Sequence, residues 1–135
     1  MKKLLSIGYS QSAFNIAMLL LRVSFGVLMI PHGYDKLVHF AQMKTHFINF
    51  LGIGSAMSLS LDIFAEFFCS LFLIFGLFTR LVVIPLIIAM CVVVAKAHHY
   101  DIFGDGEHGA MFLAGFIVIL LLGPGKISVD GLINK

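Results

Sequence analysis

The sequence predicts an all-α fold, a bundle of four membrane-spanning helices, from its composition and from the length of its apolar segments. Of the 135 residues, 60% are hydrophobic and 12% are charged, whereas a soluble domain of this size carries about 25% charged residues. A soluble fold of this composition would expose large apolar patches to water. We therefore expect residues 1–135 to form a single integral membrane domain that contacts the lipid bilayer.

Four apolar segments approach the length of a spanning helix, which is roughly 20 residues with a range of about 17–25. They cover residues 13–30, 56–78, 80–97 and 109–122. Ser12 is the expected N-cap of the first segment and Thr79 that of the third. Pro31 is expected to end or kink the first helix, and the Gly-Pro-Gly sequence around Pro124 to end the fourth.

The stretch from residue 34 to about residue 55 mixes aromatic and basic side chains. Phe47 and Phe50 recur at helical spacing beside Lys44 and His46. Such a pattern is typical of an amphipathic helix that lies in the membrane interface. We expect this interfacial segment between the first and second spans.

The distribution of lysine and arginine predicts the orientation of the chain. With both termini in the cytoplasm, five basic residues lie inside: Lys2, Lys3, Arg80, Lys126 and Lys135. Three lie outside: Lys36, Lys44 and Lys96. Because basic residues concentrate on the cytoplasmic side, we expect a multi-pass protein with both termini cytoplasmic.

Three charged side chains fall well inside the predicted spans, away from their ends, and each costs roughly 2.5–3.5 kcal/mol at mid-helix. Arg22 lies in the first span, and Asp62 and Glu66 lie one helical turn apart in the second. Arg22 follows Ala13 by nine residues and Glu66 follows Ala56 by ten. At about 1.5 Å per residue, both side chains lie about 14–15 Å deep from opposite sides. We therefore predict an ion pair between Arg22 and Glu66.

A second polar group gathers at the outer mouth of the predicted bundle. Lys36 and Lys96 are candidate partners for acids there. With Arg22 and Glu66, the mouth residues complete the predicted ligand-binding set: His32, Lys36, Asp62, His98 and Glu107.

Three kinds of function fit these charges. They could form an inert network that fixes helix packing, a site for a redox ligand such as a quinone, or a path for protons or small solutes. His98 and His99 are adjacent and point to different faces, a poor geometry for one metal ion. No metal site is therefore predicted, and the sequence leaves open whether the histidines bind a metal. Cys69 and Cys91 form no CxxC motif, which argues against a dithiol site.

Four motifs occur in order along the chain: R-x-x-x-G from Arg22, H-G-x-x-K from His32, Glu66 followed by G-L-F-T-R from Gly76, and G-P-G-K-x-S-x-D from Gly123. Together they resemble the DoxX family of small bacterial membrane proteins. The resemblance covers residues 13–131, nearly the whole chain.

The resemblance implies a four-helix fold in the bacterial inner membrane. Related DoxD proteins are linked to a thiosulfate:quinone oxidoreductase, and some DoxX proteins to membrane complexes that handle oxidative stress and thiols. By that similarity, the chain would be a subunit of a quinone-linked redox system that binds a lipophilic ligand near Arg22 and Glu66. The family positions carried over to this chain are Arg22, His32, Lys36, Glu66, Arg80 and Asp130.

Arg80 and Asp130 are expected to be structural, with Asp130 capping a backbone end or pairing with Arg80. No flavin, nicotinamide or iron–sulfur motif is present, so a membrane or soluble redox partner would supply electrons, with no covalently bound cofactor. The net charge of +2 and the absence of a basic stripe exclude nucleic acid as a partner.

Two rival functions remain open: a non-catalytic scaffold or assembly protein, and a small-solute or proton transporter, which at this size would need to oligomerise. A cavity distinguishes these functions. A transporter or a quinone-binding protein needs an open path or pocket, whereas the interior of a scaffold is filled by packed side chains. The sequence leaves open whether the chain forms a homo-oligomer and whether it has any catalytic activity.

Overall fold

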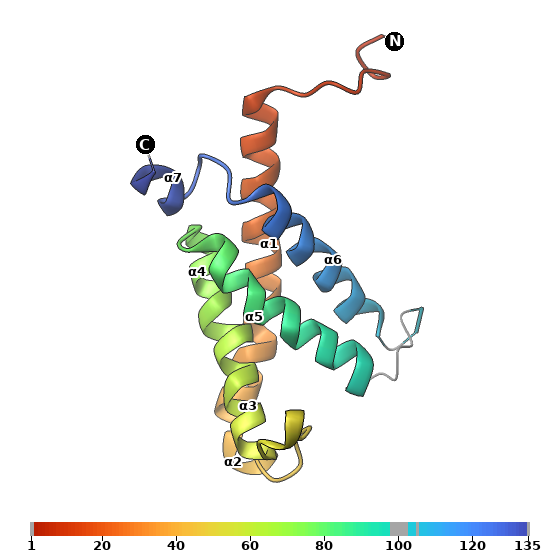
Figure 1. The fold of residues 1–135 in the computed structure, drawn as a ribbon, viewed down its shortest axis with the longest axis vertical. Helices are drawn as coiled ribbons and strands as arrows, with labels where there is room; N and C mark the ends of the chain where they lie inside the picture. The colour runs from red at the N-terminus through yellow and green to blue at the C-terminus, as the bar shows by residue number, and fades with distance from the viewer. Residues whose placement is uncertain (1, 98–102, 105, 135) are drawn as a thin grey trace.

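The computed structural model describes residues 2–97, 103–104 and 106–134. It is built of helices alone over these residues (Figure 1), which confirms the all-α prediction. In chain order the elements are α1 (Gln11–Val38), α2 (Phe40–Met43), η1 (Phe50–Gly52), α3 (Ser55–Ile63), η2 (Phe64–Cys69), α4 (Ser70–Phe75), α5 (Thr79–Val92), η3 (Val93–Ala97), α6 (Glu107–Leu122) and α7 (Val129–Ile133).

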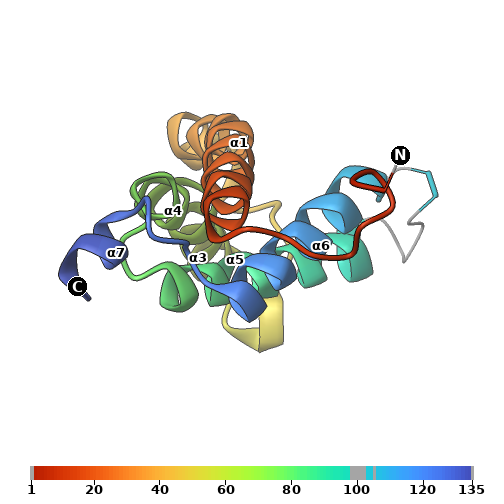
Figure 2. The same ribbon diagram turned by 90° about the horizontal axis from the view of Figure 1, so that it is seen from above.

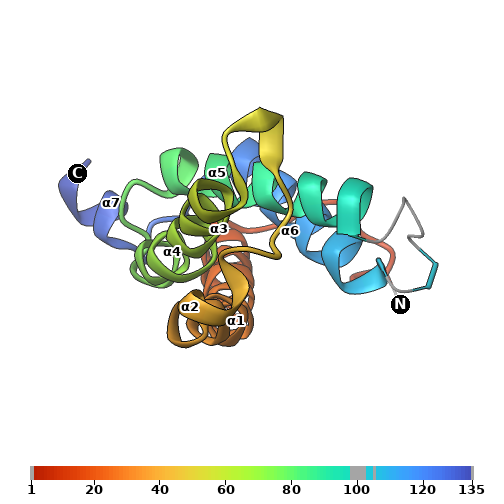
Figure 3. The same cartoon turned by 90° about the horizontal axis from the view of Figure 1, so that it is seen from below.

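The helices form two antiparallel pairs. The elements α3, η2 and α4 make one continuous helix, Ser55–Phe75, that runs antiparallel to α1. The second pair is α5 with α6, and it crosses the first pair obliquely (Figure 1). Views from above and below show α5 and α6 side by side, extending away from α1 (Figures 2 and 3). The two ends of the chain lie at one end of this arrangement, and α2 and η1 lie at the other.

Within the part of the chain that the structure describes, two helices are long and apolar enough to cross a bilayer: α1 with 28 residues and Ser55–Phe75 with 21. The other two apolar helices, Thr79–Ala95 and Glu107–Leu122, are shorter. Sixteen residues in α6 rise about 24 Å, less than the roughly 30 Å of the hydrocarbon core. The predicted four spans are therefore matched by two candidate spans and two shorter apolar helices.

Large apolar side chains cover the outside of these helices, as a lipid environment requires. Leu20, Leu81 and Leu121 are each about two-thirds exposed. The interior is packed by a cluster that includes Met18, Met29, Cys69, Leu73, Leu86, Phe116 and Ile119.

The first helix does not end at Pro31, which corrects the sequence prediction, and α1 continues to Val38. Proline removes one backbone hydrogen bond, a loss that helices in membranes tolerate. The continuation is stabilised by close packing at Gly33: a Cβ there would lie 2.6 Å from the backbone nitrogen of Phe67. Only glycine allows α1 to approach η2 this closely.

The predicted amphipathic helix over residues 34–55 is also wrong. Its first residues belong to α1, and the rest forms α2, turns and the short η1. Leu51, Gly52 and Gly54 have positive φ angles, which interrupt any longer helix. The Phe50 amide donates a hydrogen bond to Ser58 Oγ at 2.9 Å, so the segment folds back over the start of α3.

The helix ends differ from the predicted caps in two places. Ser10, and not Ser12, caps α1 by accepting a hydrogen bond from the Ala13 amide at 3.0 Å. Thr79 is the first residue of α5 and not its cap. Gly123 ends α6 as predicted.

Candidate functional site

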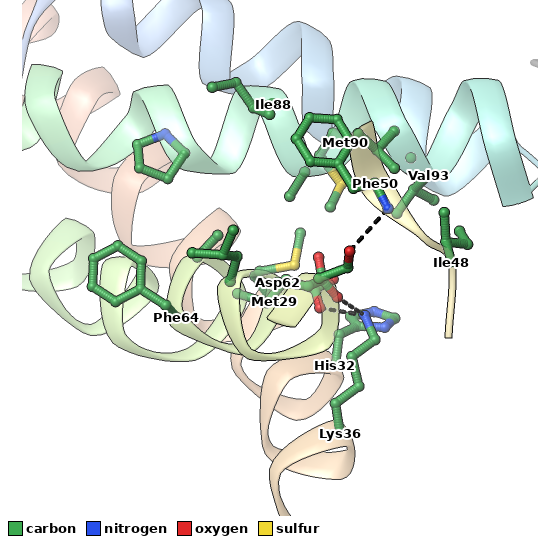
Figure 4. A pocket seen from close by; sticks show the side chains of 18 of the residues that line it. Met29, His32, Lys36, Ile48, Phe50, Asp62, Phe64, Ile88, Met90 and Val93 are labelled. Atoms are coloured by element: carbon green, nitrogen blue, oxygen red, sulfur yellow. Dashed lines mark hydrogen bonds and ion pairs between the residues drawn. The ribbon is translucent and has the colours of Figure 1, made fainter. Parts of the chain in front are cut away.

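A cavity of about 550 Å³ lies where α1, α3, η2, α5 and the start of α6 meet (Figure 4). Sites for small organic ligands have volumes of about 300–1,000 Å³ and mostly apolar walls with a few polar groups. Most of the lining here is apolar, including Met29, Phe47, Phe50, Met90 and Phe112. Its polar side chains are His32, Lys36, Ser58, Asp62, Glu66 and His108.

One wall of the cavity carries a cluster of three charged side chains, Lys36, Asp62 and Glu66. Lys36 Nζ lies 2.7 Å from Asp62 Oδ2 and also forms an ion pair with Glu66. The exposed fractions of the three side chains are 17%, 9% and 3%. The predicted pairing of Lys36 with Asp62 is therefore present, and Glu66 joins it. We call these three residues the acid–lysine cluster.

The sequence builds this cluster in two ways. Asp62 and Glu66 are four residues apart, so they point from the same face of their helix. Glu66 also lies in the π-helical η2, and π-helical turns occur frequently at functional sites. Lys36 follows Gly33 by three residues, and the close approach of α1 to η2 at Gly33 brings the lysine to the acids.

The cluster contains two carboxyl groups and one amine. If all three ionise, one negative charge remains uncompensated, which is costly in a low-dielectric environment. Binding a proton or a hydrogen-bond donor from a ligand would offset that charge. The cluster can therefore donate hydrogen bonds from Lys36 and accept them at Asp62 and Glu66.

Two histidines complete the polar part of the cavity. The ring of His32 lies edge-on to Phe112, with 6.2 Å between the ring centroids. His108 also lines the cavity, whereas its neighbour Glu107, a predicted site residue, is exposed and does not line it. Successive residues on a helix point about 100° apart, so α6 turns His108 and not Glu107 toward the cavity. The predicted site residue His98 lies outside the described residues.

Arg22 does not meet Glu66, and the predicted ion pair is wrong. The Arg22 side chain is buried and donates hydrogen bonds to the carbonyl oxygens of Leu73 at 3.1 Å and Ile74 at 3.2 Å, and to that of Ile127. Leu73 is seven residues beyond Glu66, about 10 Å along the helix.

The depth estimate failed because it placed Ala13 and Ala56 at opposite surfaces of the bilayer, whereas α1 extends beyond the predicted span 13–30 to Val38. A Cβ on Gly33 would meet Glu66 and Phe67, and one on Gly26 would meet Ser70 and Ile74. These contacts fix the register of α1 against Ser55–Phe75. Arg22, one turn before Gly26, is thereby placed at the end of α4, and Lys36 takes the position beside the acids.

Asp130 caps the start of α5, which is the first of the two roles predicted for it. Its carboxylate accepts hydrogen bonds from the amides of Phe78 and Thr79, both at 2.8 Å. Arg80 instead donates to the Leu121 carbonyl at 3.5 Å. No Arg80–Asp130 ion pair forms within the part of the chain that the structure describes, which corrects the other predicted role.

Among the described residues, no group of three or more histidine, cysteine, aspartate or glutamate side chains is placed to hold a metal ion. Both cysteines are free thiols; Cys69 is buried in the core, and Cys91 is exposed on the outside of α5.

Comparison with known proteins places this chain in a family. The DoxX family model matches residues 17–99, well over half of the sequence. This chain belongs to the DoxX family. The inner membrane protein YqjF of Escherichia coli (strain K12) is 28% identical over 127 residues, which cover 90% of this DoxX chain and 95% of YqjF. No solved structure matches. The family resemblance is thus confirmed, and this DoxX protein is a membrane protein.

Proposed function

We propose that this DoxX protein binds a lipophilic ligand of the quinone class in its cavity, as a subunit of a quinone-linked redox system in the inner membrane. The observation that carries the proposal is an apolar cavity of about 550 Å³ with the acid–lysine cluster on one wall. A molecule with an apolar body and a hydrogen-bonding headgroup matches those two surfaces. Of the predicted ligand-binding residues, the proposal keeps His32, Lys36, Asp62 and Glu66, which line the cavity, and drops Arg22, which does not.

The side chains around the cluster suit a quinone headgroup. Quinone carbonyl oxygens accept hydrogen bonds, which Lys36 and the imidazole of His32 can donate. Quinol hydroxyls donate hydrogen bonds, which Asp62 and Glu66 can accept. The electrons would come from a membrane or soluble partner protein, and this chain would hold and orient the headgroup.

We further propose that all four apolar helices span the inner membrane with both termini in the cytoplasm. The two ends of the chain lie at one end of the molecule (Figure 1), which an even number of spans requires. The shorter α5 and α6 would then be accommodated by local thinning of the bilayer or by a second copy of the chain.

A non-catalytic scaffold and a transporter are the alternatives. The cavity favours a ligand-binding protein over a scaffold that packs shut. The buried hydrogen bonds of Arg22 to backbone carbonyls support a purely structural role for that residue.

The proposal is tested by titrating the purified protein, reconstituted in lipid nanodiscs, with a short-tailed ubiquinone and a short-tailed menaquinone. Saturable binding is expected, and Asp62→Asn should weaken it at least about tenfold, the effect of losing one charged hydrogen-bond acceptor. Asp35→Asn is the matched control, because Asp35 is exposed and lies outside the cavity. Binding that does not saturate, or equal affinity in both variants, would contradict the proposal.

A further inference from the structure

The wall of the cavity between α3 and α5 is open. Leu61, Phe64 and Ile88 all line the cavity, yet they are 49%, 49% and 48% exposed. Side chains that face both a cavity and the outside of the protein lie at the opening of that cavity. We call the opening that these three residues surround the lateral opening.

The arrangement of the helices explains why the wall is open here. α5 packs against η2 and α4, and it diverges from α3 toward the end of the molecule that holds α2 and η1 (Figure 1). Phe47, Ile48 and Phe50 line the wedge between α3 and α5 but do not close it at Leu61 and Ile88.

The surface around the lateral opening is apolar. Ile84 precedes Ile88 by one helical turn and is 44% exposed, and Phe68 follows Phe64 by one turn and is also 44% exposed. Leu81 continues the same exposed side of α5. An opening with this rim faces the hydrocarbon core of a bilayer and not water.

The polar groups lie at the other side of the cavity. In Figure 4, His32 and Lys36 approach from α1, whereas Phe64 and Ile88 lie away from them on η2 and α5. The cavity is therefore polar where α1 closes it and apolar where it meets the outside of the helix bundle.

We infer that the ligand is a tailed amphiphile that enters sideways from the bilayer through the lateral opening. Its headgroup lies at the acid–lysine cluster, and its tail stays between α3 and α5, against Leu61, Phe64 and Ile88. A ligand bound in this way exchanges lipid contacts for protein contacts along its tail, so the tail is never exposed to water. The inference deepens the proposed function and rests on it for the quinone headgroup, while the route depends on the opening alone.

The route can be tested without a quinone, because the chain contains no tryptophan and a single introduced tryptophan is a clean fluorescent reporter. Phe112→Trp places the reporter on the cavity lining. Phe116→Trp is the control, one turn further along α6, fully buried and not part of the cavity lining. Phe47→Trp, also on the lining, replaces Phe112→Trp if that variant does not fold.

In nanodiscs containing phosphatidylcholine brominated on its acyl chains, we expect loss of most of the fluorescence of the Phe112→Trp reporter and little loss for Phe116→Trp. Adding Ile88→Phe should restore the fluorescence of the cavity reporter by narrowing the opening. Ile84→Phe, on the outside of the same helix, should not restore it. Quenching by aqueous iodide in place of brominated lipid would overturn the inference, as would quenching that Ile88→Phe leaves unchanged.

Failure of the proposed function gives a different result. If brominated lipid quenches the cavity reporter and Ile88→Phe relieves it, but no quinone binds saturably, the lateral route stands and the headgroup is not a quinone. If a quinone binds while only iodide quenches the reporter, the proposed function stands and the lateral route is wrong.

Discussion

Replacing Lys36 by methionine should destabilise this DoxX protein by about 3–5 kcal/mol, the usual effect of breaking a buried ion pair from one side. Methionine keeps the unbranched, apolar part of the lysine side chain and removes the charge. Asp62 and Glu66, 9% and 3% exposed, would then face each other with no counter-charge on the cluster.

The magnitude follows from the geometry. At 2.7 Å and an effective dielectric constant of about 20, the attraction of Lys36 for Asp62 alone is about 332/(20 × 2.7), or about 6 kcal/mol. Desolvation of the ammonium group offsets part of this attraction. In the Lys36→Met variant, protonation of Asp62 or Glu66 would limit the repulsion between the two acids. The expected loss of stability is therefore smaller than the summed attraction of Lys36 for both acids.

Glu66→Gln should behave differently, because it leaves one amine beside one carboxylate. The expected change is within about 1 kcal/mol, since the amide can still accept a hydrogen bond from Lys36. In the double variant, the two effects should not add, because both residues belong to one network.

The assay is equilibrium unfolding in mixed micelles or by steric trapping in bicelles. Lys44→Met is the matched control, because Lys44 is exposed and lies just after the end of α2. If Lys36→Met and Lys44→Met are equally stable, the acid–lysine cluster does not hold α1 against η2 and the reasoning is refuted.

Substitutions at two further positions test the opposite end of the molecule. Asp130→Ala should lower the free energy of unfolding by about 1–2 kcal/mol, because the amides of Phe78 and Thr79 lose their cap. Asp130→Asn should retain part of that stability. If both variants are as stable as the native protein, Asp130 does not cap α5. Arg22→Lys should cost about 2–3 kcal/mol, because a lysine cannot reproduce the fork of donors to Leu73, Ile74 and Ile127; faster proteolysis of the C-terminal segment would report the loss, and an unchanged cleavage rate would argue against it.

The sequence predicted the elements of the fold better than their register. The apolar segments and the glycine stop at Gly123 correspond to observed helices and a helix end. The placement of Asp62 and Glu66 on one face of their helix also follows from helical spacing. These features depend on residues that are close together in the sequence, so the sequence alone predicts them.

The partner of Glu66 could not be predicted because it depends on how far α1 extends. The first span was predicted to end at residue 30, with Lys36 beyond it as a partner for Asp62, whereas α1 continues to Val38 and brings Lys36 to Glu66 as well. The decisive signal was Gly33, whose missing side chain permits the close contact with Phe67. That contact is tertiary, so only the packed structure shows it.

The contribution of residues 47–50 to the cavity was hidden for a related reason. Phe47 and Phe50 were assigned to an interfacial helix because their spacing suits one. The chain instead turns at Leu51 and Gly52, and the Phe50–Ser58 hydrogen bond folds the aromatic side chains over α3. Similarly, helix geometry selects His108 over Glu107 only once the direction of α6 is known.

The most direct test of the ligand-binding cavity is a density map of the protein purified in nanodiscs with its native membrane lipids. We predict non-protein density that begins at Lys36, Asp62 and Glu66 and extends outward between Leu61 and Ile88. A map in which side chains of α5 fill this space against α3, with no such density, would contradict the account.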